Sequence, residues 1–113
     1  MNAVTIGVST VEETKQRMLL AFDGAEQGAF IGFPTVDLLW KVLTAKRWDI
    51  LRAMTEAGPL PIREIARRVG RDVKTVHGDV HALLRAGVID RTEDGHVEFP
   101  YDAVHVDFVL RAA

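Results

Sequence analysis

Two apolar stripes at helical spacing, separated by a glycine, constrain the fold of this 113-residue chain more than any other feature. The first stripe covers residues 62–69, Gly70 follows it, and the second covers residues 73–84. Glycine adopts the left-handed backbone conformation at the lowest cost, so Gly70 predicts a tight turn between two helices. Ala66 and Val76 lie at offsets from Gly70 that allow close approach and burial of the second helix against the first.

A third helix precedes this pair, and a β-hairpin follows it. Apolar residues recur at helical spacing over residues 44–57, after which a glycine and a proline are expected to end the helix. Residues 88–91 and 96–99 flank Asp94-Gly95, a dipeptide typical of hairpin turns. Three helices followed by a hairpin are the element order of a winged helix-turn-helix. We therefore expect an α+β chain with a three-helix core and a β-hairpin wing.

The two ends of the chain lie outside this pattern. We assign residues 1–35 to an N-terminal extension and residues 36–113 to the winged helix-turn-helix domain with its C-terminal strand. The ends are expected to form a strand, a helix, a strand and a last strand, over residues 3–8, 11–22, 29–33 and 103–110. Pairing of the first and last strands, within one chain or across a two-fold axis, would cover an apolar edge, with the helix packed on the sheet. The extension is the expected dimerisation or partner-binding element.

Charge is segregated along the chain, so the net charge of −2 understates a basic centre. Residues 1–40 carry a net −3 and residues 93–113 a net −4, whereas residues 41–92 carry eleven Lys or Arg against six Asp or Glu. A local basic segment is typical of a nucleic-acid-binding module. The acidic ends favour a basic protein partner.

Several function classes lack the residues that they need. The chain has no cysteine, which excludes disulfide scaffolds, cysteine nucleophiles and thiolate zinc sites. Ser9 is its only serine, and no nucleophile elbow, phosphate-binding loop or dinucleotide loop occurs, so we expect no enzyme. His77 and His81 have the spacing of helical metal pairs but no evident third ligand, so we expect neither metal nor cofactor.

The helices and the hairpin resemble a known family. The stretches that carry the resemblance are residues 43–48, 61–77, 84–90, 94–95 and 100–102. They look like small prokaryotic MarR-like winged-helix proteins, over about residues 36–110. Members are described as DNA-binding transcriptional regulators, and some as antitoxin components of toxin–antitoxin pairs. The resemblance implies the fold and DNA binding. Pro61 departs from it, because related helices often start with a Ser or Thr cap.

The helix over residues 73–86 is expected to enter the major groove and to present its N-terminal residues to base edges. Its apolar residues from Val73 to Leu84 are expected to face the core, with His77 packed on the core flank. We expect Arg71 and Lys74 to be exposed and to contact phosphates or guanine edges. The full set of expected DNA-binding residues is Arg63, Arg67, Arg68, Arg71, Lys74, Thr75, Gly78, His81, Arg85 and Arg91.

These observations predict a cytoplasmic, sequence-specific regulator of transcription that binds double-stranded DNA as a homodimer. No apolar run approaches the length of a membrane span, so no membrane partner is expected. The main alternative is a protein-interaction module, such as an antitoxin that binds a basic toxin, with DNA binding autoregulatory or absent. An RNA-binding winged helix is a third alternative.

Overall fold

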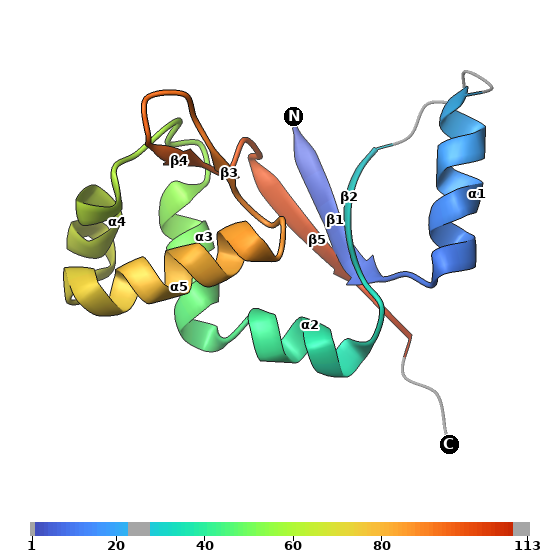
Figure 1. Cartoon of the computed structure of the whole chain (residues 1–113), viewed down its shortest axis with the longest axis horizontal. Helices are drawn as coiled ribbons and strands as arrows, with labels where there is room; N and C mark the ends of the chain where they lie inside the picture. The colour runs from blue at the N-terminus through green and yellow to red at the C-terminus, as the bar shows by residue number, and fades with distance from the viewer. Residues whose placement is uncertain (1, 23–27, 110–113) are drawn as a thin grey trace. The chain divides into compact units, whose positions relative to one another are not determined.

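The computed structural model of the chain describes residues 2–22 and 28–109 (Figure 1). Within these residues, five helices and two small sheets form an α+β fold. The chain divides into two compact units: a sheet unit of residues 1–41 and 103–113, and a helical unit of residues 42–102. None of the helices in the described ranges combines the length and apolar character needed to cross a bilayer.

The sheet unit is built on a three-stranded parallel sheet. Its central strand is β1 (Ala3–Val8), which pairs with β2 (Ala29–Phe33) on one side and β5 (Ala103–Asp107) on the other. The register brings Val4 of β1 opposite Val104 of β5. The first and last strands therefore pair within one chain, which is one of the two arrangements expected from the sequence.

Helix α1 (Val11–Phe22) connects β1 to β2 and meets the sheet through a cation. The guanidinium carbon of Arg17 lies 3.9 Å from the ring centroid of Phe30 in β2. The same ring covers Gly32, where an added Cβ would lie only 2.9 Å from a ring carbon. Over residues 11–20 every side chain is exposed, so the expected packing of this helix on the sheet is not found there. The side chains of residues 21 and 22 lie outside the described part of the helix.

Helix α2 (Val36–Val42) begins at a threonine cap. The Thr35 hydroxyl accepts a hydrogen bond from the Leu38 amide at 3.1 Å, which satisfies one of the free donors of the first turn. Leu39 is fully buried, whereas Trp40 is exposed and meets the edge of the Phe108 ring at a centroid distance of 5.8 Å.

The helical unit contains three helices followed by a hairpin. They are α3 (Ala45–Met54), α4 (Ile62–Val69), α5 (Val73–Arg85), β3 (Asp90–Arg91) and β4 (Val97–Glu98). All three helices and the hairpin contribute fully or almost fully buried apolar side chains. Those from the helices are Ile50, Leu51, Met54, Ile65, Ala66, Val76, Val80 and Leu83, and those that follow them are Val88, Ile89, Val97 and Phe99. This shared core holds α5 and the hairpin in one body.

Helix α3 is shorter than the sequence predicts. It ends at Met54 instead of Ala57, because the backbone leaves the helical conformation at Thr55, which has a ψ of 130°. Glu56 follows in the left-handed conformation with a φ of 60°, and Gly58 is also left-handed at 70°. The expected position of the helix end was therefore wrong by one turn.

The hairpin strands are also shorter than expected, but the turn between them is confirmed. Gly95 has a φ of 84° and donates its amide hydrogen bond to the Thr92 carbonyl at 3.1 Å. Leu60, just before α4, extends the pairing: its backbone N–H and C=O both bond to Val97, at 2.8 and 2.9 Å. The hairpin is thereby tied to the segment that leads into α4.

Candidate nucleic-acid interface

Helix α5 begins at a turn that local residues stabilise. Gly70 ends α4 in the predicted left-handed conformation, with a φ of 68°. The Asp72 carboxylate accepts a hydrogen bond from the Thr75 amide at 3.2 Å, as expected for an N-cap. The Thr75 hydroxyl also lies 3.1 Å from this carboxylate, so its polar group is engaged in the cap. Pro61 precedes α4 without a side-chain cap, which confirms the departure noted in the sequence.

One stripe of α5 is buried in the helical unit. Val76, Val80 and Leu83 have no exposed surface. Val73 is 49% exposed, so the expectation that it faces the core is wrong. Helical side chains tilt toward the N-terminus, and Val73 in the first turn therefore projects past the end of the core. Leu84, also expected in the core, is only partly buried.

The opposite stripe of α5 faces solvent. Lys74, Gly78 and Arg85 are exposed and His81 is partly exposed, as the helical spacing predicts. Lys74 and Arg85 form no ion pair with any residue that the structure describes. A Cβ added at Gly78 would meet no atom within 4 Å, so this glycine is not required for packing inside the protein. The stripe thus carries two cations without an ion-pair partner among the described residues, Lys74 and Arg85, and Gly78 between them has no side chain that projects from the helix.

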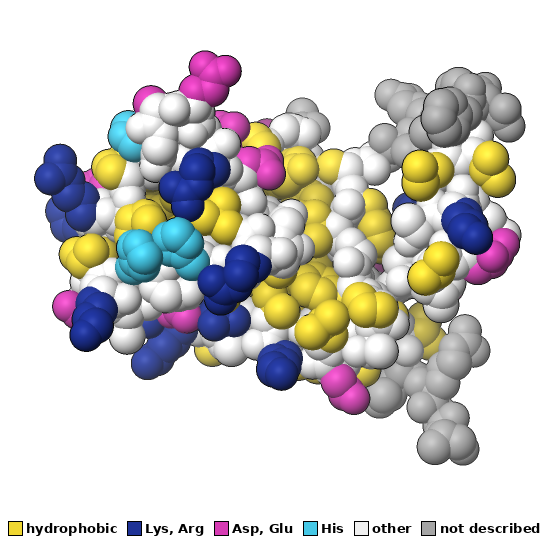
Figure 2. Space-filling view, viewed as in Figure 1, with side chains coloured by type: hydrophobic (Ala, Val, Ile, Leu, Met, Phe, Trp, Pro, Cys, Tyr) yellow, Lys and Arg dark blue, Asp and Glu magenta, His cyan; other side chains and the backbone are white. Residues whose placement is uncertain are grey.

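Two histidines lie side by side on this face of α5. The ring centroids of His77 and His81 are 4.1 Å apart, with 36° between the ring planes. His77 is exposed, and the expectation of a packed histidine on the core flank is wrong, because it follows exposed Val73 by one turn. Figure 2 shows histidine side chains with Lys and Arg side chains around them on this surface.

The charges around His81 connect α5 with the hairpin. Partial burial lowers the pKa of His81 below its ordinary value, and the positive charges of His77, Arg91 and Arg85 lower it further. Arg91 belongs to β3 and Arg85 to the last turn of α5, so each of these elements places a cation near the imidazole of His81. No group of three or more metal-ligating side chains occurs among the described residues.

The hairpin itself has mixed charge. Arg91 is exposed in β3 and pairs with no carboxylate of the described residues. At the tip, hydrogen bonds from the Thr92 hydroxyl and from the His96 amide lower the pKa of Asp94. The tip is therefore anionic at neutral pH, and the base of the hairpin is the part suited to a polyanion.

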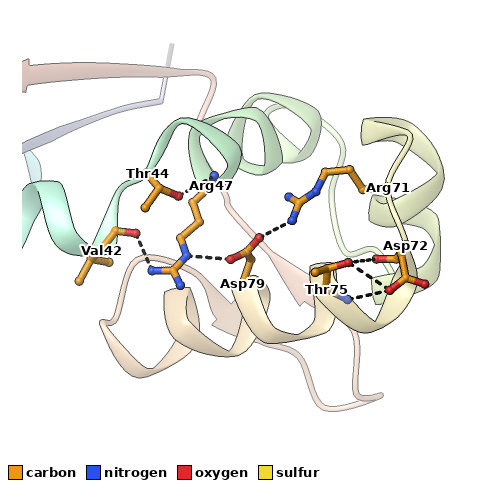
Figure 3. A network of polar contacts seen from close by, with 7 residues as sticks. All are labelled: Val42, Thr44, Arg47, Arg71, Asp72, Thr75 and Asp79. Atoms are coloured by element: carbon orange, nitrogen blue, oxygen red, sulfur yellow. Dashed lines mark hydrogen bonds and ion pairs between the residues drawn. The ribbon is translucent and has the colours of Figure 1, made fainter.

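Asp79 joins α5 to two other segments of the helical unit (Figure 3). Arg47 of α3 donates from Nε to Oδ1 at 3.0 Å, and Arg71 before α5 donates from Nη2 to Oδ2 at 2.8 Å. Arg47 also donates to the Val42 carbonyl at 2.9 Å. Partial burial opposes ionisation of Asp79, but the hydrogen bonds from Arg71 and Arg47 dominate and lower its pKa. This network links α5 to α3 and to the preceding turn.

Arg71 is therefore not the exposed cation expected from the sequence. Its side chain is 20% exposed, and its Nη1 atom is buried without a hydrogen-bond partner among the described residues. The roles of Asp79 and Arg47 were not predicted from the sequence. The available signal was an aspartate between the core positions Val76 and Val80, since an acid so placed needs a cationic partner.

Ion pairs also engage two arginines of α4. Arg67 and Arg68 donate to the Glu64 carboxylate at 2.7 and 2.8 Å. These hydrogen bonds, from Arg67 and then Arg68, lower the pKa of Glu64 to about 2. Arg63 is exposed and pairs with no described residue. The α4 surface therefore carries one cation without an ion-pair partner in the described part of the chain, Arg63, and two cations that share the Glu64 carboxylate.

A family model described as HVO_A0114 matches residues 42–106 of the chain. The match covers more than half of the 113 residues and includes the whole helical unit, with α5 and the hairpin. No curated protein matches the chain. The chain therefore belongs to the HVO_A0114 family.

Proposed function

We propose that the chain is a transcriptional regulator that binds double-stranded DNA in a sequence-specific manner. In this proposal, α3, α4 and α5 with the β3–β4 hairpin form a winged helix-turn-helix of the MarR-like type, and α5 enters the major groove. The observation that carries the proposal is the solvent stripe of α5, where Lys74 and Arg85 have no carboxylate partner among the described residues. A helix with unpaired cations on its open face is suited to a groove lined by phosphates.

The proposed set of DNA contacts is smaller than the set expected from the sequence. Among the residues expected to bind DNA, four Lys or Arg side chains form no ion pair with described residues. These, here called the unpaired cations, are Arg63, Lys74, Arg85 and Arg91. Lys74, near the start of α5, is the strongest candidate for a base contact, because the N-terminal part of a recognition helix reaches base edges. Arg63, Arg85 and Arg91 are better suited to phosphates. Gly78 permits close approach of the helix backbone.

The remaining cations of the expected set have partners within the protein. Arg67 and Arg68 share Glu64, and Arg71 is bound to Asp79. A contact between these arginines and DNA would compete with an existing ion pair. We therefore assign them to shaping the α4–α5 surface.

A matched pair of substitutions tests the assignment of α5. Selection from a random duplex pool supplies the best DNA site, and fluorescence anisotropy measures its affinity. Lys74→Ala is expected to weaken binding by about 1–3 kcal/mol if Lys74 contacts a base. Arg52→Ala removes the same charge from α3, at a side chain that is 81% exposed, and is expected to change binding by less than about 0.5 kcal/mol. Equal affinities for both variants would contradict the proposal.

A second function is favoured by the surface of α1. Val11, Met18 and Leu19 are large apolar side chains that are exposed in the isolated chain. Exposed apolar groups that share a helix favour a protein partner, either a second copy or a basic toxin. Sedimentation of the purified chain distinguishes these readings. A dimer that Leu19→Glu converts to a monomer supports the homodimer, whereas a monomeric chain that purifies with a small basic protein supports the antitoxin.

A further inference from the structure

The two neighbouring histidines of α5 lie within the proposed DNA-binding surface. His77 and His81 are one helical turn apart, and their ring centroids are separated by 4.1 Å. Neither imidazole forms a hydrogen bond or ion pair with a carboxylate in the part of the chain that the structure describes. Imidazole is the side chain that ordinarily changes charge between about pH 5 and 8. Two such groups on one open face therefore form a surface whose charge depends on pH.

The charged groups that act on His81 lie on α5 itself and on β3. On α5 they are Arg85 and the imidazole of His77, and from β3 it is Arg91 that acts on His81. Helices α3 and α4 pack against α5, but the cations near that interface, Arg47 and Arg71, are held by Asp79 on the other side of the helix. The charges that act on His81 among the described residues are thus cationic.

We propose that His77 and His81 form a proton-dependent phosphate contact, so that DNA binding takes up protons on α5 and strengthens as the pH falls. This inference rests on the proposed function. It adds a regulatory property to the same surface and identifies the anionic DNA backbone as the group that the histidines recognise.

Electrostatics of the pair explains the direction of the effect. In the free protein, protonation of His81 is opposed by its partial burial and by the neighbouring His77, Arg91 and Arg85. A phosphate between these groups adds negative charge, offsets the repulsion and accepts charge-assisted hydrogen bonds from the protonated rings. The charged imidazole is therefore favoured in the complex and disfavoured in the free chain.

The sign of the pH dependence follows from this difference. Burial and the surrounding cations hold the pKa of His81 below its ordinary value of 6.5 in the free chain, and a bound phosphate raises it. Affinity gained from the proton is complete below the free pKa and is lost as the pH rises through the pKa of the complex. Each proton taken up changes the dissociation constant by at most about tenfold per pH unit between those two pKa values.

Anisotropy titrations across pH test the proposal. The probe is a labelled duplex of mixed sequence, about 20 base pairs long, because phosphate contacts do not depend on sequence. The wild type is titrated at constant ionic strength from about pH 8 to about pH 5.5, beside His77→Gln, His81→Gln and the double variant. Glutamine keeps a hydrogen-bond donor but cannot gain the charge. The matched control is His105→Gln, at an exposed position of β5.

The dissociation constant of the wild type is expected to fall by roughly tenfold or more over this range, and that of the double variant by less than about twofold. His105→Gln should retain the wild-type dependence. Titration of the histidine ring protons by NMR should show the pKa of His81 rising when the duplex is added. Binding by the wild type without pH dependence, or a double variant that keeps it, would overturn this inference and leave the proposed function standing. Absence of binding at every pH, both to this duplex and to the selected site, would overturn both.

Discussion

Replacing Asp79 by alanine tests the network that ties α5 to the rest of the helical unit. The change leaves the guanidinium groups of Arg47 and Arg71, which are 21% and 20% exposed, without their shared carboxylate. A hydrogen bond to a charged group contributes about 1.5–3 kcal/mol, and two such bonds are lost while Arg47 keeps the Val42 carbonyl. Because both cations can turn partly toward solvent, we expect the free energy of unfolding to fall by about 2–4 kcal/mol.

Urea denaturation followed by circular dichroism measures this loss. The matched control is Asp49→Ala, which removes an exposed carboxylate 3.5 Å from Arg52 and should cost less than about 0.5 kcal/mol. The pKa of Asp79 is lowered in the folded chain, so its contribution is present above the ordinary value of 3.8 and is lost as the pH falls through the lower folded value. The difference in the free energy of unfolding between the wild type and Asp79→Ala should therefore decrease in strong acid. Equal losses for Asp79→Ala and Asp49→Ala would refute the role of the network.

Three further predictions follow from exposure, backbone conformation and charge. Val76→Ala should lower the free energy of unfolding by about 1–3 kcal/mol in urea denaturation, and Val73→Ala, at an exposed position, by less than about 0.5 kcal/mol. Gly70→Ala should lower the melting temperature because of its left-handed backbone, whereas Gly78→Ala should add up to about 1 kcal/mol of stability, since its Cβ meets no atom. For DNA binding, the three unpaired cations assigned to phosphates, Arg63, Arg85 and Arg91, predict a slope of log affinity against log salt of roughly −2.7 per protomer, and a slope near zero would contradict phosphate contacts.

The sequence predicted the features that depend on short-range backbone chemistry. The left-handed turn at Gly70 and the Asp94-Gly95 hairpin turn both occur where expected. Each depends on the conformational preference of one residue or on a contact within three positions along the chain. Such features need no knowledge of the neighbouring elements, which is why a single sequence predicts them.

The features that failed depend on what lies beside an element. Helical periodicity correctly assigned Val76 to the core, but it also assigned Val73, because it does not show where the covering helices end. The prediction that His77 packs on the flank of the core was wrong for the same reason. Arg71 was expected to be open, and only the three-dimensional contact with Asp79 shows that it is engaged. The sequence thus predicted which face of the helix forms the candidate site, but it did not predict the partners of individual side chains.

The pairing of β1 with β5 affects the order in which the chain can fold during synthesis. Val104 pairs with Val4 from one hundred residues further along, whereas the helical unit is one continuous segment. The helical unit can therefore complete its core from contacts within one segment, whereas β1 keeps one edge open until β5, which follows that whole segment, has been synthesised. Contacts between such distant segments form slowly, so closure of the sheet is expected to limit the folding rate. An open edge on a nascent chain is also the place where mispairing between neighbouring chains on one message would begin.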